Sequence, residues 1–474
     1  MTAPLWTWDE LAAAAEGVAD GAPSGPITGF AIDSRQIVPG DVFVALTDQR
    51  DGHEFVPSAF AAGAVAAVVA EGYTRQSGAG ALVRVKETLK GLEAIGKAAR
   101  ARLSPEARVV AVTGSAGKTG SKEMLRGCLT KLGATHAPEK SFNNHWGVPL
   151  TLARMPAATD FGVFEIGMNH AGEITPLTRL VRPHVAVITT VEPVHLGYFA
   201  SVEEIADAKA EIFLGLEPNG VAVLNRDNPH FDRLKAKALA AGAYVASFGT
   251  SAQADVRPGS IELGSDGTKI QADCFGGRVI YSIGAPGRHL AMNSLAVLAA
   301  IEALEIDFES TIYAMSALAD FRAPAGRGAR ELLEGPRGRV LLVDESYNAN
   351  PASMRAALAS LALVPRADWR RRVVVMGDML ELGERSQELH AELAEAVEAA
   401  GADIVFASGP HMKAMFDRLG LGRRGAWAQS PDGLERPLLD TIGDGDMVMV
   451  KGSLGSRMGP LVTALRSHIR GASA

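Results

Sequence analysis

Short apolar runs alternate with helical patterns along most of the chain. From residue 107 the runs RVVAVTG, FGVFEIG and HVAVITTV read as buried strands, and segments such as KTGSKEMLRGCLTKLG between them read as helices. After residue 338 the runs RVLLVDES, RRVVVMGD, ADIVFASG and DMVMVKGS repeat this alternation. Apolar strands separated by helices predict an α/β fold, with mostly parallel, doubly wound sheets in both segments.

The remaining segments have different patterns. Near the N-terminus, GFAIDSRQIVPGDVFVAL predicts two strands joined by a Pro-Gly turn, and FVPSAFAAGAVAAVVA predicts a helix followed by a buried strand. ETLKGLEAIGKAARARL predicts a long helix that could link domains. The run SIELGSDGTKIQADCFGGRVIYSIG alternates and contains the turn signals Asp266-Gly267 and Gly276-Gly277, which predict an antiparallel insertion. HLAMNSLAVLAAIEAL then returns to a helical pattern.

These changes of pattern divide the chain into three predicted domains. The Gly/Arg-rich stretch FRAPAGRGARELLEGPRG, at 321–338, marks one boundary. We therefore expect a small N-terminal α/β domain at 1–88, a central domain with the doubly wound sheet at 89–320, and a Rossmann-like C-terminal domain at 321–474. A chain of 474 residues has room for about three domains of roughly 150 residues each.

Composition excludes several classes of protein. The formal charge of −7 and the lack of a dense Lys/Arg run argue against a nucleic-acid partner. Two cysteines are too few for a disulfide framework and suit a reducing compartment. The start, MTAPLWTWDELAAAAEG, lacks the features of a signal peptide, and no uncharged apolar run approaches the roughly 18–20 residues of a membrane span. We expect a cytoplasmic protein.

The stretch AVTGSAGKTGSKEML is the strongest local signal for a ligand. A buried strand runs into a Gly-rich turn and then into a helix, the context in which backbone N–H groups bind phosphate. Lys118 would reach the terminal phosphates and the Thr119 hydroxyl would bind Mg²⁺. The match is to the shorter Gly-x-x-Gly-Lys-Thr form, because Val112 occupies the position of the first Walker glycine. The alternative is a chance Gly/Lys turn. The loop residues are Gly114, Ser115, Ala116, Gly117, Lys118, Thr119 and Gly120.

Two polar residues lie at or just beyond neighbouring apolar strands. Glu165 falls inside FGVFEIG, where a buried carboxylate without a partner is costly, so a metal ion or another cation is expected beside it. A structural ion pair is the alternative. His195 follows the strand HVAVITTV. A structural role and a role as a ligand are equally consistent with the sequence at this position.

Lys209 is unusual because it falls on the apolar face of a predicted helix. The stretch SVEEIADAKAEIFLGL, at 201–216, predicts a helix, with Ser201 as N-cap and Glu204 completing a capping box. Lys209 lies in the middle of its apolar face. Burial lowers the pKa of a lysine, and a neutral amine can react with CO₂ to form a carbamate, which is an anionic, carboxylate-like metal ligand. The alternative is a snorkelling lysine whose head reaches water.

Taken together, these segments resemble the Mur ligase family, the ATP-dependent amide-forming ligases of peptidoglycan synthesis. The resemblance covers essentially the whole chain. It rests on DSRQIVPGDVFVAL and DGHEFVPSAFAAGA, similar to a uridine-nucleotide domain, and on TGSAGKT, HLGYFASVEEIADAKAEIF, DESYNANPASM and GDMLELGERSQELH. NNHWGVPLTL and EIGMNHAGEI resemble the branch that adds D-Ala-D-Ala to UDP-N-acetylmuramoyl-tripeptide.

The resemblance implies a reaction and its components. ATP would activate the tripeptide carboxylate as an acyl phosphate, which D-Ala-D-Ala then attacks, with Mg²⁺ as the metal. The third residue of the tripeptide stays open between diaminopimelate and lysine. We expect a monomer with no nucleic-acid partner and no membrane span. Three alternatives are kept: a diaminopimelate-adding ligase, a folylpolyglutamate synthetase-like ligase, and a nucleotide-binding switch without catalysis.

The resemblance also implies roles for individual residues. Lys118, Glu165, His195 and Lys209 would be the catalytic set, with Thr119, Glu165, His195 and a carbamylated Lys209 at the metal. Besides the loop, Asn293, Arg327 and Asp344 would contact ATP. Ser34 and Arg35 would contact the uridine nucleotide, Asn143, Asn144, Asn169 and His170 would line the substrate path, and Tyr347, Asn348 and Asn350 would lie near the dipeptide.

The chain departs from the family pattern at three positions. Gly120 follows Thr119 where Thr or Ser is usual, and Leu290 follows His289 where many members have Asn. Glu345 occupies the position of a common second Asp. None of the three removes a group that the chemistry requires.

Overall fold

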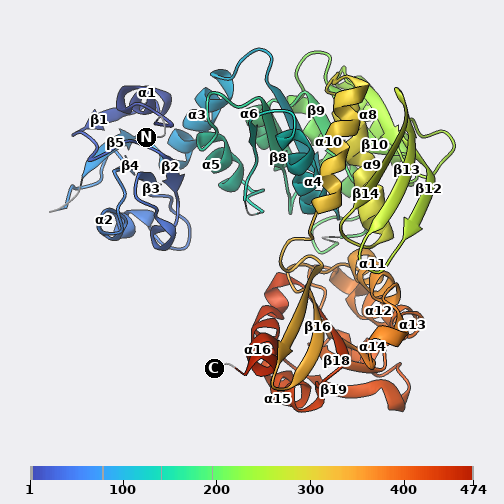
Figure 1. Cartoon of the computed structure of the whole chain (residues 1–474). Coiled ribbons are helices and arrows are strands. Elements are labelled where there is room, and N and C mark those ends of the chain that lie inside the picture. Colours follow the sequence, from blue (N-terminus) through green and yellow to red (C-terminus); the bar gives the residue numbers. More distant parts are fainter. Residues whose placement is uncertain (1–3, 77–79, 140, 195, 472–474) are drawn as a thin grey trace.

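The chain forms three lobes that follow one another in sequence (Figure 1). The computed structural model describes residues 4–76, 80–139, 141–194 and 196–471. His195 therefore lies outside the described residues. The blue N-terminal lobe lies beside the central lobe, and the orange and red C-terminal lobe lies below the central one (Figure 1).

The N-terminal lobe contains a five-stranded sheet. Its order is β1 (Val18–Asp20), β5 (Ala81–Val85), β4 (Ala66–Ala70), β3 (Asp41–Val44) and β2 (Gly29–Ala31), with helices α1 (Trp8–Ala14) and α2 (Val56–Ala61) and 3-10 turns η1 (Ser34–Gln36) and η2 (Gly52–Phe55). Both strands predicted around the Pro-Gly turn are present, but β2 and β3 pair in parallel. A parallel pair needs a crossover, so the connection includes η1 as well as the turn.

The predicted linking helix is α3 (Thr88–Ala101). It packs against α1 and β4 of the N-terminal lobe and against α5 (Gly147–Ala153) and α6 (Ile174–Val181) of the central lobe. Two long side chains add hydrogen bonds across this junction: the Trp6 indole donates to the Ala153 carbonyl at 3.0 Å, and the Arg154 Nε donates to the Phe30 carbonyl at 2.8 Å. The N-terminal lobe is therefore held against α5 by apolar packing and by buried hydrogen bonds.

The central lobe is built on a six-stranded sheet in which every pair is parallel. Its order is β11 (Tyr244–Phe248), β10 (Val221–Asn225), β9 (Val185–Ile188), β6 (Arg108–Thr113), β8 (Phe161–Glu165) and β7 (Thr135–His136). Alternate residues of β6 enter different cores: Val110 and Val112 pack on one face, Val109 and Ala111 on the other. Helices cover both faces, so the predicted doubly wound sheet is confirmed.

The helices of this lobe divide between the two cores. The first core is shared by α4 (Lys118–Thr130), α9 (Arg288–Glu302) and α10 (Phe308–Met315) with η4 (Ser316–Asp320), and the second by α6, α7 (Val202–Ala210), η3 (Glu211–Gly215) and α8 (Phe231–Ala240). The predicted antiparallel insertion is also confirmed. It is a three-stranded sheet of β12 (Arg257–Leu263), β13 (Thr268–Cys274) and β14 (Gly277–Ile283).

The helix predicted over 201–216 is shorter than expected. The α-helix ends at Ala210 and continues as the 3-10 turn η3. Ser201 accepts from the Glu204 N–H as predicted, but the Glu204 carboxylate accepts from the Ala200 N–H instead of completing the capping box on Ser201. Glu211, the first residue of η3, accepts hydrogen bonds from Gly172 and Thr175. The local sequence pattern could not predict this tertiary contact.

The C-terminal lobe contains a second six-stranded sheet. Its order is β15 (Ala329–Gly335), β16 (Gly338–Glu345), β20 (Asp446–Lys451), β17 (Arg371–Gly377), β18 (Ile404–Ser408) and β19 (Arg424–Ala428). All pairs are parallel except β15 with β16. The Gly/Arg-rich stretch 321–338, predicted as a domain boundary, contains the edge strand β15, which was not predicted.

Helices and 3-10 turns surround this sheet. They are α11 (Pro351–Ala362), η5 (Arg366–Asp368), η6 (Gly383–Arg385), α12 (Ser386–Ala391), α13 (Leu393–Ala399), α14 (Met412–Phe416), η7 (Leu421–Arg423), α15 (Asp432–Thr441), η8 (Leu454–Ser456) and α16 (Gly459–Arg470). In the part of the chain that the structure describes, no helix combines the length and the apolar character needed to span a bilayer.

Candidate active site

The Gly-rich turn lies between β6 and α4, as predicted. Gly114 (φ +149°) and Gly117 (φ +83°) have backbone conformations that favour glycine. A Cβ on Gly117 would also lie 2.6 Å from the Asn293 Oδ1, so α9 approaches the loop too closely for a larger residue. The turn brings the N-terminus of a 13-residue helix to the carboxyl edge of the sheet. Free N–H groups and the helix dipole make this a favourable place for an anion.

Lys118 is the first residue of α4, and its side chain folds back over the loop. Its Nζ donates to the Gly114 carbonyl at 2.6 Å. Burial lowers the pKa of Lys118, Glu165 raises it, and Arg327 lowers it again, which leaves it below the ordinary value. The ammonium is thus held at the loop, close enough to both side chains for their charges to affect it.

Glu165 lies at the end of β8, 1% exposed. Its carboxylate accepts hydrogen bonds from the Thr119 hydroxyl at 2.8 Å, the Ser141 hydroxyl at 2.9 Å and the Asn143 amide at 2.7 Å. Burial raises the pKa of Glu165, but the charge of Lys118, then that of Arg327, and these hydrogen bonds bring it below the ordinary value. An ionised carboxylate is therefore stabilised in the interior beside the loop.

The chemistry of this pair fits Mg²⁺. The Thr119 hydroxyl and the Glu165 carboxylate are oxygen donors in contact with each other, and Mg²⁺ is usually held by one or two carboxylates together with substrate phosphates. The described residues contain no group of three or more His, Cys, Asp or Glu that could hold a metal by themselves. A magnesium ion here would thus take part of its ligand shell from a bound nucleotide.

Lys209 is buried in α7, with 2% of its surface exposed. This burial contradicts the snorkelling alternative, in which the ammonium would reach water. Burial, followed by the nearby charge of Lys118, lowers the pKa of Lys209 well below its ordinary value. Among the residues that the structure describes, none makes a hydrogen bond or an ion pair with its amine, so the neutral form is favoured.

Two clefts meet at the Gly-rich turn. The first cleft, with an empty volume of ≈ 1250 Å³, lies between the turn, α9 and the start of α11. Its walls include Ala116, Gly117, Gly120, Thr189, Thr190, Glu192, Asn225, Leu290, Asn293, Arg327, Glu345, Asn348, Asn350 and Lys451. The second cleft, of ≈ 1950 Å³, includes Ser115, Lys118, Ser141, Asn143, Asn144, His145, Glu165, Asn169, Glu173, Arg327, Tyr347, Asn348, Asn350, Leu380, Ser453 and Leu454.

Three residues of the C-terminal lobe line both clefts: Arg327, Asn348 and Asn350. Asn350 caps α11, and its amide donates to the Ser115 carbonyl at 3.4 Å. The Arg327 guanidinium lies over the Tyr347 ring, 4.4 Å from its centre. The C-terminal lobe therefore reaches the Gly-rich turn directly.

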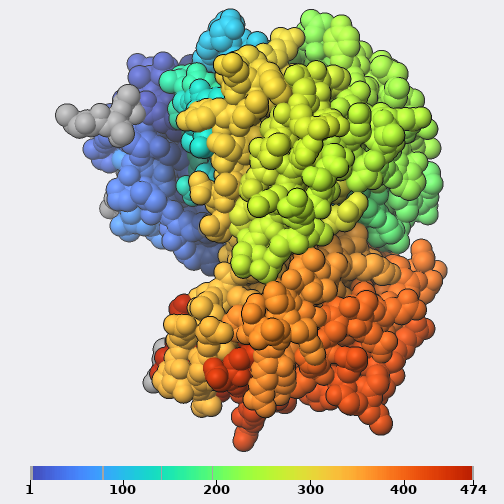
Figure 2. All heavy atoms as spheres, turned by 45° about the vertical axis from the view of Figure 1, so that its right-hand side comes forward, coloured from blue at the N-terminus to red at the C-terminus, as the bar shows by residue number. Residues whose placement is uncertain are grey.

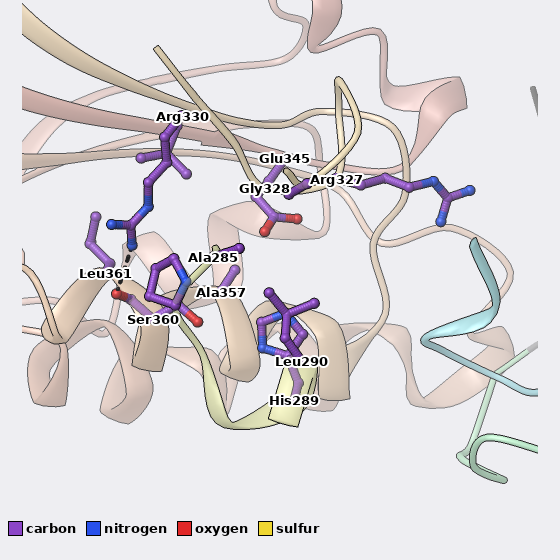
Figure 3. A pocket seen from close by; sticks show the side chains of 13 residues that line it. Ala285, His289, Leu290, Arg327, Gly328, Arg330, Glu345, Ala357, Ser360 and Leu361 are labelled. Carbon is purple, nitrogen blue, oxygen red and sulfur yellow. Dashed lines mark hydrogen bonds between the residues drawn. The ribbon is translucent and has the colours of Figure 1, made fainter. Parts of the chain in front are cut away.

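A smaller cavity adjoins the first cleft at the seam between these lobes (Figure 3). Arg330 spans the seam, donating to the Ser360 carbonyl at 3.3 Å and to the Ser265 carbonyl of the antiparallel insertion at 2.5 Å. Glu345 faces this cavity, whereas Arg327 extends away from it (Figure 3). Figure 2 shows the orange and green atoms of the two lobes meeting along this seam.

Not every predicted site residue joins this group. Ser34 and Arg35 lie at η1 in the N-terminal lobe, where Arg35 pairs with Asp33 at 2.8 Å, and neither lines a cleft. Asp344 is buried near the end of β16 and accepts from Ser346, and it lines neither cleft. His170 contacts Glu173 at 3.0 Å beside the second cleft without lining it.

Several residues of the site were not predicted. Ser141 bonds Glu165 directly, and Thr190 and Glu192 follow β9 on the wall of the first cleft. Lys451 ends β20, and its Nζ donates to Glu345 at 3.1 Å and to the Asn348 carbonyl at 3.0 Å. A polar residue at the end of an apolar strand was the available signal, since open α/β sheets bind ligands at that edge.

Known proteins share this architecture and much of the sequence. Residues 112–301 match the Mur ligase middle domain, and residues 330–454 match the Mur ligase glutamate ligase domain. A UDP-N-acetylmuramoyl-tripeptide–D-alanyl-D-alanine ligase of Escherichia coli is 36% identical over 92% of this chain and 93% of that protein. The Bacillus subtilis protein of the same name is 31% identical over 93% of each chain. The crystal structure of MurF from Acinetobacter baumannii superposes with a TM-score of 0.82 at 29% identity, covering 98% of this chain and 99% of that one.

Proposed function

The chain belongs to the Mur ligase family, and we propose that it joins D-Ala-D-Ala to UDP-N-acetylmuramoyl-tripeptide with cleavage of ATP to ADP and phosphate. The observation that carries this proposal is the meeting of two clefts at one phosphate-binding turn, with Arg327, Asn348 and Asn350 common to both. A nucleotide in the first cleft would place its terminal phosphate next to a substrate in the second. The identity to D-Ala-D-Ala ligases over most of the chain supports this choice of substrates.

The reaction needs an activated carboxyl group, because a carboxylate is a poor electrophile. The terminal carboxylate of the tripeptide attacks the γ-phosphorus of ATP, which gives an acyl phosphate and ADP. The amine of D-Ala-D-Ala then attacks the acyl carbon, loses a proton, and displaces inorganic phosphate as the amide forms. The two steps together consume one ATP for each amide bond.

The residues of the turn act on the phosphates. The backbone N–H groups between β6 and α4 bind phosphate oxygens, and the Lys118 ammonium offsets the charge that builds up on the transferred group. Thr119 and Glu165 are the residues that would hold Mg²⁺ there. When bound, such an ion neutralises phosphate charge and orients the reacting oxygens. Residues of both lobes at the edge of the clefts exclude water that would hydrolyse an acyl phosphate.

We assign Lys209 to the same site as a carbamate. The proposal is supported by its 2% exposure, its lowered pKa and the absence of a partner among the described residues. Burial disfavours the charged form of an unmodified amine there, whereas the carbamate supplies one negative charge, shared by two oxygens, near Lys118. His195 is proposed as a further metal ligand from the sequence alone.

The remaining roles are proposed from the family resemblance, and for some residues their position in a cleft supports the assignment. Asn293 and Arg327 line the first cleft and are assigned to ATP, with Asp344. Asn143, Asn144 and Asn169 line the second cleft and are assigned, with His170, to the tripeptide. Tyr347, Asn348 and Asn350 are assigned to the dipeptide, and Ser34 and Arg35 to the uridine nucleotide. The proposal places the protein in the cytoplasm as a monomer, because its substrates are ATP and a UDP-linked precursor.

The test is phosphate release by the purified chain, omitting each substrate in turn. We expect release only with ATP, Mg²⁺, UDP-tripeptide and D-Ala-D-Ala together. Turnover with diaminopimelate on a UDP-dipeptide, or with glutamate on a folate, would instead support another ligase of this chemistry. Nucleotide binding without phosphate release under any of these conditions would support a non-catalytic switch.

A further inference from the structure

Large apolar side chains are exposed on one wall of the second cleft. Among the exposed large hydrophobic side chains in the described part of the chain, three line this cleft: Tyr347 at 36%, Leu380 at 41% and Leu454 at 63%. All three belong to the C-terminal lobe. The wall from the central lobe presents charged and amide groups, among them Lys118, Glu165 and Asn143. Its large apolar members, Met168, Leu177 and Val194, are buried, and the smaller Pro176 is exposed.

The three apolar residues follow adjacent strands. In the C-terminal sheet β16, β20 and β17 are consecutive and parallel, so their carboxyl ends lie side by side. Tyr347 follows β16, Leu454 follows β20 and Leu380 follows β17. This edge is where an open α/β sheet binds its ligand. The exposed leucines are therefore placed by the sheet, together, in a cleft.

Ser453 holds the three loops at this edge. Its hydroxyl accepts from the Leu380 N–H at 3.0 Å and donates to the Ala349 carbonyl at 3.3 Å. The two leucine-bearing loops also approach each other closely, because a Cβ on Gly455 would lie 2.7 Å from the Leu380 Cδ1. Leu380 and Leu454 thus lie on connected, closely spaced loops at one edge of the cleft, and we call this pair the leucine wall.

We propose that the leucine wall packs against the methyl groups of the incoming dipeptide and so determines which dipeptide is accepted. This inference rests on the proposed function. The central-lobe wall suits the phosphates and the carboxylate to be activated, which leaves the C-terminal wall for the amine substrate. In D-Ala-D-Ala the two methyl groups are the apolar side chains, and covering them with leucine removes apolar surface of both molecules from water.

The experiment combines changes in the enzyme with changes in the dipeptide. We would measure kcat/KM with D-Ala-D-Ala, D-Ala-Gly and Gly-D-Ala for the full chain and for Leu454→Ala, Leu380→Ala and Leu421→Ala. Leu421 is the matched control, since it is 82% exposed in the same lobe and lines neither cleft. The unmodified chain should prefer D-Ala-D-Ala to at least one glycyl dipeptide by about 10-fold or more.

In Leu454→Ala or Leu380→Ala, we expect this preference to shrink to within about threefold, because the methyl group has lost its contact. The KM values for ATP and UDP-tripeptide should stay within about twofold, and Leu421→Ala should match the unmodified chain. Gly455→Ala, which displaces Leu380 without removing it, should reduce the same preference by a smaller factor.

Two results would overturn the inference. One is an unchanged preference in both leucine variants, together with a raised KM for UDP-tripeptide, which would assign the wall to the other substrate. The second is an unmodified chain that accepts glycyl dipeptides as well as D-Ala-D-Ala. An unmodified chain with no D-Ala-D-Ala-dependent turnover would refute the proposed function itself, a different and separately visible outcome.

Discussion

Two buried lysines, one in the central lobe and one in the C-terminal lobe, are accommodated in opposite ways. Lys209 and Lys451 are each 2% exposed. Lys451 donates to the Glu345 carboxylate and to the Asn348 carbonyl, so its charge is paired at the end of β20. Lys209 has no such partner among the described residues, and burial lowers its pKa.

The presence or absence of a partner decides which protonation state of a buried lysine is favoured. A buried cation that is paired can stay charged, and removing its partner is costly. Burial without a partner favours the neutral form of an amine, which is the nucleophilic form. Lys451 thus stays paired in the wall of the first cleft, while the environment of Lys209 supports the proposal that its amine is modified.

The largest expected effect is a loss of catalytic activity when Lys209 is replaced. Lys209→Ala should lower kcat for phosphate release by about 10²–10³-fold, because it removes an anion from the site. Short carboxylates such as formate or acetate, added at millimolar to molar concentration, should restore part of the activity. Lys235→Ala, an exposed lysine on α8, is the control and should behave like the unmodified chain. Near-normal turnover by Lys209→Ala would disprove the carbamate.

The next effect is on the stability of the C-terminal lobe. Lys451→Met leaves the Glu345 carboxylate, 15% exposed, without its cation, and should cost about 3 kcal/mol of unfolding free energy. The double variant Lys451→Met/Glu345→Leu should recover most of that loss. Urea unfolding followed by the fluorescence of Trp369 and Trp427, both in this lobe, measures the effect. An equal loss of unfolding free energy in the single and double variants would show that the unpaired Glu345 carboxylate is not the cause of the destabilisation.

A smaller effect concerns pH. In the unfolded chain Lys209 is protonated up to about pH 10.4, whereas burial lowers its pKa in the folded chain, so the folded chain gives up the proton at a lower pH. Between the folded-state and unfolded-state pKa values folding releases a proton, so the unfolding free energy rises with pH across that range. Lys209→Met lacks this gain. Its stability advantage over the unmodified chain should therefore decline from pH 7 to pH 10, measured in CO₂-free buffer.

The smallest effect concerns the pH dependence of stability due to His184, a buried histidine that is neutral although it has a hydrogen-bond partner. His184 Nδ1 accepts from the Val109 N–H at 2.9 Å, and burial, followed by the charges of Arg100 and Arg108, lowers its pKa to about 4. The unfolded chain takes up the proton near pH 6.5, so stability is lost as pH falls from 6.5 toward 4. Relative to His184→Asn, whose oxygen can also accept, the unmodified chain should lose about 1 kcal/mol between pH 6.5 and 5.5. Parallel curves for the two proteins would contradict this.

Local patterns were sufficient for most of the fold. The strand and helix alternation, the Gly-rich turn and the antiparallel insertion all follow from side-chain periodicity and turn residues within about 15 residues. β15 was missed because its sequence, ARELLEG, is too polar to show the apolar pattern of a buried strand. It forms an edge strand by pairing with the apolar strand β16. The end of α7 was misjudged because Glu211 bonds residues some 40 positions away.

The sequence by itself determined which residues can do chemistry here: the Gly-rich turn, Glu165 and a lysine on an apolar helix face. The tertiary structure alone decided which of them meet. Asn350 reaches Ser115 from 235 positions away, and Lys451 pairs with Glu345 across two strands of one sheet. The physical reason is that periodicity reflects burial along one element, whereas a site forms where the ends of several elements converge, and that convergence depends on strand order.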